Sequence, residues 1–471
     1  IYYINLSKDA YKLGGSSFAQ TRNAIGDEAP TIRDDRYFKT VFNSIQSLID
    51  EGHIIAGHDV ASGGLITTLL ELCFADIELG AKLDLTSLGE PDTIKLLFSE
   101  NAAIVFQSKD ASIESKLNAA HIDVKKIGTV ISKAEVTIKN NGMEMGLNVS
   151  TLRDTWYKTS YLLDEQQTAK GLAKERYEHY KVQPLHYVFP ENFKGKLLGR
   201  AESRPETNGI STPLDVTAKT VRPKAAILRE KGSNSEREMA NAMYLAGFDV
   251  KDVHMTDLIS GRETLADIHF LGAVGGFSNS DVLGSAKGWA GAIKYNEKAN
   301  KVINDFFARP DTLSVGICNG CQLFMELDLI NPEHKAHGKM TFNDSRKHES
   351  NFTSVKIHKN NSVMLSSLEG AVLGVWISHG EGKFKLPLSE DHYDIVAKYG
   401  YDSYPANPNG SDYNTAMLCD KTGRHLVTMP HIERSTFPWN WAYYPKDRKD
   451  EISPWLEAFV NARKWVENIS R

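Results

Sequence analysis

Apolar positions in the second half of the chain alternate between two spacings. Residues such as Met239, Ala242 and Met243 recur at the spacing of one helical face. Between such helices, several segments are expected to form strands: residues 225–228, 249–253, 270–274, 312–317, 354–358, 372–378 and 425–429. This alternation predicts an α/β domain with a doubly wound, mostly parallel sheet, in which ligands bind at the carboxyl ends of the strands.

The helix after the first of these strands has recognisable start and stop signals. Ser235 stands three residues before Glu238, which is the spacing of a capping box. Gly247 follows the last apolar position, where glycine commonly ends a helix. We therefore expect a helix that is capped by the Ser235 side chain and ends at Gly247.

The first 155 residues mix strands and helices in a different pattern, typical of an α+β domain. Apolar residues recur at helical spacing over residues 37–50. Strand-like runs are expected to form a half-buried sheet: residues 1–6, 97–98, 103–106 and 135–138.

A glycine pair in this first region opens another predicted helix. Gly63 and Gly64 precede Leu65, Leu69 and Leu72, which recur on one helical face. Backbone N–H groups at such a helix start can meet an anion, so the pair is a candidate phosphate-binding turn. A tight turn between strand and helix explains the same residues, and the residues alone favour this simpler interpretation.

Between the two patterned regions the composition changes twice. Residues 156–187 are charged and helix-prone with few apolar positions, which is typical of a solvated connector. Residues 199–223 are rich in Pro, Thr, Ser, Glu and Gly, the composition of a linker. We therefore predict three parts: an α+β domain at 1–155, a helical connector and linker at 156–222, and the doubly wound domain at 223–471.

Bulk properties exclude several classes of protein. A length of 471 residues exceeds what one hydrophobic core usually holds, so two or three domains are expected. The net charge of −5 gives no electrostatic case for nucleic acid or an anionic membrane, and no stretch approaches the length of a membrane span. Four scattered cysteines do not make a disulfide framework, so we expect a reducing cytoplasm. The chain begins without methionine, directly in a strand-like run, and we expect a fragment of something longer.

The segment 312–327 carries the clearest chemistry. It predicts a strand, a tight turn and a helix, with Cys318 at the turn and Gly316 and Gly320 on either side, as in a nucleophile elbow. N–H groups at the helix start favour a thiolate and could hold an oxyanion. Together with Cys321, the same cysteine also fits a redox dithiol or half of a metal site. No second Cys or His pair stands at ligand spacing, so we favour the nucleophile and predict no metal site.

A cysteine nucleophile needs a base and a group that orients that base. His431 and Glu433 follow a predicted strand and supply both, because residues i and i+2 share a face of an extended segment. An acid near one of 15 histidines by chance is also common, and the residues alone leave both interpretations open. Gly276 and Phe277 could present a second N–H group to the oxyanion, beside that of Asn319.

The motifs, in their order along the chain, resemble those of class I (triad) glutamine amidotransferases. The resemblance is carried by GGFS at 275–278, GICNGCQ at 316–322 and MPHIER at 429–434. Four further motifs make the chain similar to the phosphoribosylformylglycinamidine synthase family: KGSNS at 231–235, DVLG at 281–284, HGEG at 379–382 and NPNGS at 407–411. The first region resembles the C-terminal copy of that family's aminoimidazole-ribonucleotide-synthetase-like domains, through LGGSSFAQ at 13–20, HDVASGGL at 58–65 and LFSE at 97–100.

The resemblance implies a reaction in two places. Cys318 would attack the side-chain amide of glutamine, His431 would protonate the departing ammonia, and water would hydrolyse the glutamyl thioester. Ammonia would then convert formylglycinamide ribonucleotide to the amidine at an ATP- and Mg²⁺-dependent synthetase site of purine biosynthesis. Gln322 would help to hold glutamine. His379 would be a neighbour of the glutamine site, although a loop histidine in a glycine turn explains it equally well.

The chain departs from the family pattern in places that affect these expectations. Ser62 stands where the family commonly has Asp, which weakens the case for a catalytic metal nucleotide in the first region. Ile432 replaces the usual proline between His431 and Glu433. We expect the chain to lack the N-terminal synthetase half, so that formylglycinamide ribonucleotide and ATP would act through that half. ATP and Mg²⁺ are expected in the intact enzyme, and no cofactor is assigned to this fragment. The alternative hypothesis is a non-catalytic regulatory or binding subunit of a synthetase, with Cys318 as a relic.

Overall fold

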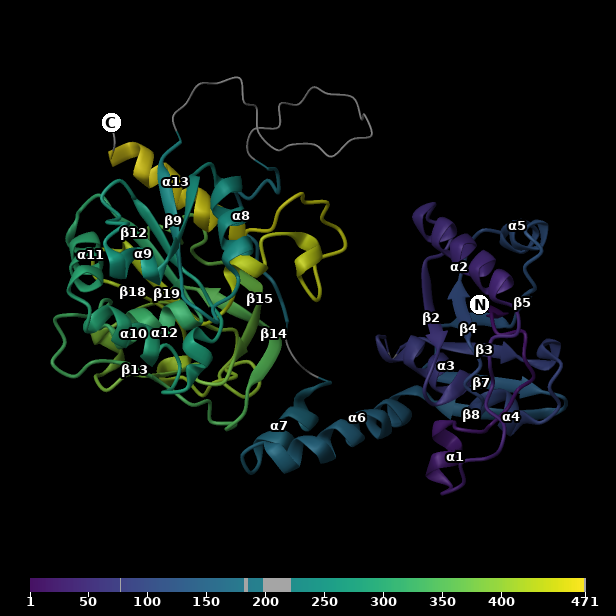
Figure 1. The fold of residues 1–471 in the computed structure, drawn as a ribbon. Helices are drawn as coiled ribbons and strands as arrows, with labels where there is room; N and C mark the ends of the chain where they lie inside the picture. Colours follow the sequence, from purple (N-terminus) through teal and green to yellow (C-terminus); the bar gives the residue numbers. More distant parts are fainter. Residues whose placement is uncertain (77, 182–184, 198–221, 470–471) are drawn as a thin grey trace. The chain divides into compact units, whose positions relative to one another are not determined.

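The computed structural model describes residues 1–76, 78–181, 185–197 and 222–469, which form two compact units (Figure 1). The first unit is Ile1–Leu162 and the second is Leu163–Arg471. Most of the predicted linker, residues 199–221, lies outside the described residues. The predicted division at 1–155, 156–222 and 223–471 therefore stays a prediction. Within the described part, no helix combines the length and the apolar composition needed to cross a membrane.

The first unit contains two four-stranded sheets, with strand orders β2-β4-β1-β5 and β6-β3-β7-β8. The strands are β1 (Tyr2–Asn5), β2 (Ala56–Val60), β3 (Gly80–Asp84), β4 (Ala103–Gln107), β5 (Val124–Lys126), β6 (Gly128–Ile131), β7 (Glu135–Asn140) and β8 (Met143–Asn148). The helices are α1 (Ser17–Thr21), α2 (Asp35–Asp50), α3 (Gly64–Phe74), α4 (Thr93–Phe98) and α5 (Ile113–Ala119). Alternate residues of β1 enter different cores, because Tyr3 packs with Leu65 of α3 whereas Ile4 packs with Val41 of α2. The predicted α+β class is confirmed.

One predicted strand of this unit is wrong. Residues 97–98 read as strand-like, but Leu97 and Phe98 end the helix α4. The Asp92 side chain accepts hydrogen bonds from the N–H groups of Ile94 and Lys95, and this cap starts the helix. With six residues, α4 is too short to show helical periodicity in the sequence.

The second unit is built on a nine-stranded sheet, in the order β10-β9-β11-β12-β19-β18-β17-β14-β15. The pairs from β10 to β19 are parallel, and the remaining pairs are antiparallel. The strands are β9 (Lys224–Arg229), β10 (Asp249–His254), β11 (Phe270–Ala273), β12 (Leu313–Ile317), β14 (Glu349–Ile357), β15 (Val372–His379), β17 (Asp394–Tyr399), β18 (Thr415–Cys419) and β19 (His425–Thr428). The predicted α/β fold class is confirmed, with an antiparallel extension of the doubly wound part.

Helices cover this sheet in two groups (Figure 1). In one group α8 packs against α13, and in the other α10 packs against α11 and α12, with α9 beside α11. Their bounds are α8 (Glu236–Ala246), α9 (Met255–Ser260), α10 (Lys287–Lys294), α11 (Glu297–Ala308), α12 (Asn319–Glu326) and α13 (Trp455–Ile469). A second, two-stranded sheet consists of β13 (Lys339–Thr341) and β16 (Lys383–Lys385), which pair with each other and not with the large sheet.

The predicted capping box at the start of α8 is wrong, although the helix and its end at Gly247 are confirmed. Ser235 has a left-handed backbone, and its side chain does not cap the helix. Its hydroxyl instead accepts a hydrogen bond from the N–H of Gly275, at 3.3 Å. Glu238 pairs with Arg434, at 3.4 Å. Contacts with distant segments thus replace the local cap that the spacing suggested.

The charged segment before the predicted linker is helical, as predicted, and forms α6 (Val149–Gln167) and α7 (Leu172–His179). The interpretation of this segment as solvated is wrong for its second half. Asp164 and Thr168 are 7% and 8% exposed, and Ala173 of α7 is 3% exposed. These residues pack within the second unit, which begins at Leu163.

Candidate active site

The turn at Cys318 joins β12 to α12. Cys318 has φ 53° and ψ −106°, a backbone conformation that residues other than glycine rarely adopt. A Cβ atom on Gly316 would lie 2.6 Å from the carbonyl oxygen of Gly320, and one on Gly320 would lie 2.1 Å from that of Ala273. The predicted strand, turn and helix are confirmed, and the two glycines permit the close backbone approach that the turn requires.

The Cys318 side chain is 5% exposed and lies beside His431. Its Sγ atom is 3.6 Å from the carbonyl oxygen of Ser378, at the end of β15. Gly275 contacts both residues: an added Cβ would lie 3.4 Å from Cys318 Cβ and 2.9 Å from His431 Cε1. The fold thus brings together two residues that lie far apart in the chain.

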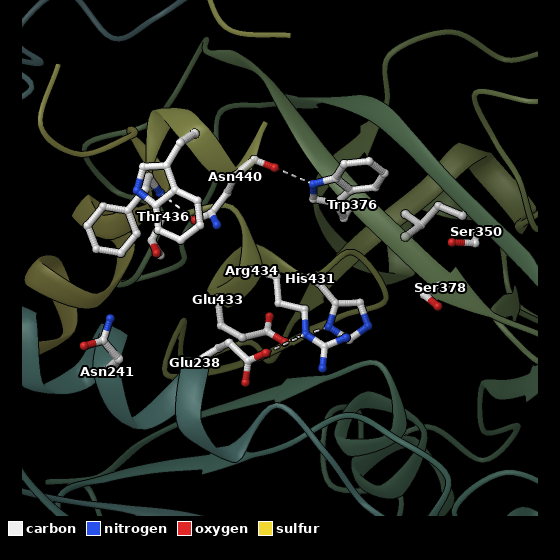
Figure 2. Close-up of a pocket in the computed structure, with 13 residues that line it drawn as sticks. Glu238, Asn241, Ser350, Trp376, Ser378, His431, Glu433, Arg434, Thr436 and Asn440 are labelled. Carbon is white, nitrogen blue, oxygen red and sulfur yellow. Dashed lines mark hydrogen bonds and ion pairs between the residues drawn. The ribbon is translucent and has the colours of Figure 1, made fainter. Parts of the chain in front are cut away.

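His431 is joined to Glu433 by a hydrogen bond of 2.7 Å between Nδ1 and Oε1 (Figure 2). Burial alone would lower the pKa of His431, but the charges of Glu433 and Cys318 and the hydrogen bonds to both raise it to about 10. Burial would raise the pKa of Glu433, yet the charge of His431 outweighs it and the pKa falls. The environment therefore favours a charged imidazolium beside an ionised carboxylate.

The geometry that joins this pair differs from the predicted one. An extended segment was expected to place His431 and Glu433 on one face. Instead, Ile432–Arg434 forms a 3₁₀ turn that His431 precedes. The turn brings the carboxylate back to the ring, so the predicted contact is present for a different reason.

Gly276–Phe277 was expected to present a second N–H group to the oxyanion, and the N–H of Phe277 is already engaged. Phe277 donates its N–H to the carbonyl oxygen of Gly232, at 3.0 Å. Gly276 has φ +117°, and an added Cβ would lie 2.5 Å from the backbone nitrogen of Asn234. The Gly276 N–H makes no hydrogen bond to any of the described residues. Gly276, rather than Phe277, is thus the donor that remains on this loop, and Asn319 begins α12 on the other side.

The side chains of Asn319 and Gln322 connect three loops around the turn. The Asn319 amide accepts from the N–H of Ser278 at 3.2 Å and donates to Gln322 Oε1 at 3.0 Å. Gln322 Nε2 donates to the carbonyl oxygen of Glu381 at 2.8 Å. Both side chains are buried, and their hydrogen bonds link the loops around Cys318 to one another.

Two acidic residues of this site were not singled out by the sequence analysis. Glu381 accepts from the N–H of Ser285 at 3.3 Å, and Ser285 donates its hydroxyl to Asp281 at 3.1 Å. Burial raises the pKa of Asp281, to which the charge of Glu381 adds. Both acids lie in motifs that carried the family resemblance, DVLG and HGEG, and that was the signal available to find them.

His379 ends β15 and is buried at 2% exposure. Burial, together with the charges of His431 and His348, lowers the pKa of His379 to about 3, so the ring is neutral. Neither ring nitrogen has a hydrogen-bond partner within the described part of the chain. The structure thus places His379 near His431, as an uncharged ring.

A cavity of about 590 Å³ reaches the His431–Glu433 pair from one side (Figure 2). The residues that line it include Trp376, Ser378, His431, Glu433 and Arg434. Figure 2 shows the His431 ring with Glu433 on one side and Ser378 on the other. Small molecules that enter this cavity can therefore reach the imidazole of His431.

The Gly63–Gly64 turn belongs to the first unit, whereas Cys318 and His431 belong to the second. Gly63 has φ +90° and precedes α3, as the glycine pattern predicted. Its N–H is donated to Glu100 Oε1 at 2.8 Å, and the same oxygen accepts from the N–H of Ser17 at 2.8 Å. The anion that meets this turn is a carboxylate of the protein itself.

The four cysteines are all free thiols. Cys321 is fully buried, and burial raises the pKa of its thiol well above the usual value. Across the described ranges, no cluster of three or more His, Cys, Asp or Glu side chains is arranged to hold a metal ion. The surroundings of Cys321 are those of a small apolar core residue.

Two family models match the chain. The CobB/CobQ-like glutamine amidotransferase domain matches residues 222–466, which is more than half of the chain and contains Cys318, His431 and Glu433. The chain belongs to this glutamine amidotransferase family. The C-terminal domain of AIR synthase related proteins matches residues 4–140 of the first unit.

Full-length relatives of the amidotransferase carry a more specific name. Probable phosphoribosylformylglycinamidine synthase, chloroplastic/mitochondrial, of Arabidopsis thaliana is 37% identical over 99% of this chain and 34% of its own length. Phosphoribosylformylglycinamidine synthase of Homo sapiens is 34% identical over 99% of this chain and 36% of its own length. The resemblance to this family is confirmed over the whole chain, which spans about a third of the curated relatives' length.

A solved structure, PurLQS from Thermotoga maritima, is 22% identical with a TM-score of 0.41 and covers 53% of this chain and all of its own.

Proposed function

We propose that this chain is the glutamine-hydrolysing part of a phosphoribosylformylglycinamidine synthase. The observation that carries the proposal is the convergence of Cys318, on its strained turn, with the buried His431–Glu433 pair. A relic cysteine in a regulatory subunit would not need a left-handed backbone or a charged imidazole beside it. These features are those of a nucleophile with its base and orienting acid.

The reaction begins with the Cys318 thiolate and the His431 imidazolium. The thiolate attacks the side-chain carbonyl of glutamine, and a C–S bond forms while the carbonyl oxygen becomes an oxyanion. The N–H groups of Gly276 and Asn319 stabilise that charge. When the oxyanion collapses, the C–N bond breaks, and His431 gives its proton to the departing nitrogen, which leaves as ammonia.

Hydrolysis of the glutamyl thioester reverses these roles. His431, now neutral, accepts a proton from water as the water oxygen attacks the thioester carbonyl. The second tetrahedral intermediate releases glutamate and restores the thiolate beside the imidazolium. Glu433 holds Nδ1 throughout, so Nε2 is the nitrogen that exchanges protons with the reacting groups.

In the whole enzyme, the ammonia would convert formylglycinamide ribonucleotide to formylglycinamidine ribonucleotide, with ATP and Mg²⁺. The residues present here do not fit those groups, because Glu100 already holds the Gly63 N–H and Ser62 is not a metal ligand of choice. A cytoplasmic location stays a prediction.

The test is labelling with a diazoketone analogue of glutamine, located by peptide mass spectrometry. We expect one label per chain, at Cys318, and protection of that label by glutamine. The Cys318→Ala variant should take no label. Cys73→Ala, which removes a partly exposed thiol of the first unit, should label like the wild type. Binding of glutamine without labelling would support the regulatory subunit and overturn the proposal.

A further inference from the structure

The end of α6 and the helix α7 precede the amidotransferase match at residue 222, yet they make buried polar contacts with it. Arg176 of α7 donates to Asp164 Oδ2 at 2.7 Å and to Glu349 Oε2 at 2.5 Å. Tyr404 donates its hydroxyl to Glu349 Oε1 at 2.8 Å and also contacts Arg176. Glu349, 3% exposed, thus has an ionic partner on a helix outside the family domain.

A second set of contacts reaches the residues just before Glu349. Asp164 pairs with Lys347, and Thr168 donates its hydroxyl to Asp164 at 2.6 Å. Ala169 donates its N–H to the carbonyl oxygen of Ser345, at 2.9 Å. Burial would raise the pKa of Asp164, but Lys347, Thr168 and Arg176 lower it, which agrees with a carboxylate that is ionised and held.

The segment held in this way, residues 343–349, in turn holds the end of β15. Asn343 donates from Nδ2 to the carbonyl oxygens of His379 at 2.7 Å and of Lys347 at 3.1 Å. His348 Nε2 lies 3.0 Å from the hydroxyl of Ser378. Glu349 is the register partner of His379 across the β14–β15 pair. The same strand end supplies the carbonyl oxygen of Ser378, 3.6 Å from Cys318 Sγ.

We propose that Arg176 is a positioning residue for the Cys318 site. Arg176 holds Glu349 directly, and it holds Asp164, which in turn holds the neighbouring Lys347. These contacts fix the strand end that contacts the nucleophile. The inference rests on the proposed glutaminase function. Removing Arg176 leaves a buried carboxylate without its cation, and a displacement of about 1 Å at a reacting group can lower a rate on the order of a hundredfold.

The experiment compares Arg176→Met with the wild type in the full chain. We expect the rate of Cys318 labelling by the diazoketone analogue to fall about 10- to 100-fold. In glutamine hydrolysis, kcat should fall by a similar factor while KM changes by less than about threefold, since the glutamine-side loops keep their own contacts. Arg176→Lys keeps the charge and should recover part of the rate. Lys174→Met, on an exposed side chain of the same helix, is the matched control and should match the wild type.

A double variant separates positioning from fold stability. Arg176→Met with Glu349→Gln no longer buries an unpaired charge, so its melting temperature should return towards that of the wild type. Its labelling rate should stay low, because the bond that fixes the strand end is still missing. Recovery of both quantities, or wild-type labelling of a folded Arg176→Met, would overturn the inference. Failure of the proposed function would look different, because the wild type itself would then take no label.

Discussion

His431 and Glu433 stand two residues apart, and a 3₁₀ turn brings Nδ1 of the first to 2.7 Å from Oε1 of the second. The side chains are 3% and 0% exposed. An ion pair so deeply buried is stable only while both partners are charged. The raised pKa of His431 and the lowered pKa of Glu433 both follow from that requirement.

Replacing Glu433 by Gln should therefore slow the chemistry at neutral pH. Without the carboxylate charge the pKa of His431 falls, so the imidazolium that stabilises the Cys318 thiolate is lost. We expect alkylation of Cys318 by iodoacetamide at pH 7 to slow by about tenfold or more, since each loss of about 1.4 kcal/mol in charge stabilisation is a factor of ten.

The matched control is Glu238→Gln, because Glu238 lines the same cavity but pairs with Arg434 instead of the imidazole. Its alkylation profile should coincide with that of the wild type. A wild-type rate of alkylation at pH 7 in Glu433→Gln would show that the pair does not control the reactivity of the thiol.

Gly320, two residues after Cys318, should be sensitive to a single added methyl group. In Gly320→Ala the new Cβ would lie 2.1 Å from the carbonyl oxygen of Ala273, a backbone atom that cannot move aside easily. We expect a loss of about 1–3 kcal/mol in unfolding free energy, which exceeds the helix propensity gained by alanine. Urea or thermal unfolding of the full chain measures the loss.

Gly291 offers the control, since it lies inside α10 and an added Cβ meets nothing within 4 Å. Gly291→Ala should therefore stabilise the chain by about 0.5–1 kcal/mol. Equal effects of the two substitutions would contradict the close approach at the turn.

The sequence predicted local elements well where the signal was local. Periodicity located α2 and α8, and the glycines around Cys318 located the turn, because sterics at a sharp bend restrict the residues allowed there. The spacing of Ser235 and Glu238 suggested a cap, but Ser235 accepts from Gly275, forty residues away in the chain. Contacts of this kind are set by the tertiary fold, which a local pattern does not encode.

The same reason explains what was missed around the site. Ser285 and Glu381 meet across 96 residues, and Arg176 and Glu349 across 173. The connector was predicted to be solvated because the sequence shows its charged side chains but not the distant side chains with which they pair. His431 and Glu433 were paired correctly from an incorrect backbone conformation, since proximity in the chain was enough to bring them into reach.

Glu100 should stabilise the first unit through the hydrogen bonds that its carboxylate accepts at the glycine turn. Its Oε1 accepts two backbone N–H groups, from Gly63 and Ser17. Glu100→Ala would leave both without this acceptor, and we expect a loss of about 1–3 kcal/mol in the unfolding of this unit. Glu100→Gln keeps a carbonyl oxygen at the same place and should retain part of that stability.

Inorganic phosphate then tests the candidate phosphate-binding turn. If the turn accepts anions, phosphate should raise the melting temperature of Glu100→Ala more than that of the wild type, where the carboxylate competes. Equal shifts in the two proteins would argue for a plain tight turn at Gly63–Gly64.

Substitution of Cys321 distinguishes the interpretation of Cys318 as a nucleophile from its interpretation as half of a redox dithiol. It is fully buried in α12, and the high pKa of its thiol keeps it neutral. Cys321→Ala should leave Cys318 labelling by the diazoketone analogue within about twofold, with or without a reductant, and destabilise the chain by about 1 kcal/mol through the small cavity. Cys321→Ser, which buries a hydroxyl, should be less stable than Cys321→Ala. If Cys321→Ala instead abolished labelling, or made it depend on reductant, the two cysteines would act as a pair and the nucleophile interpretation would fail.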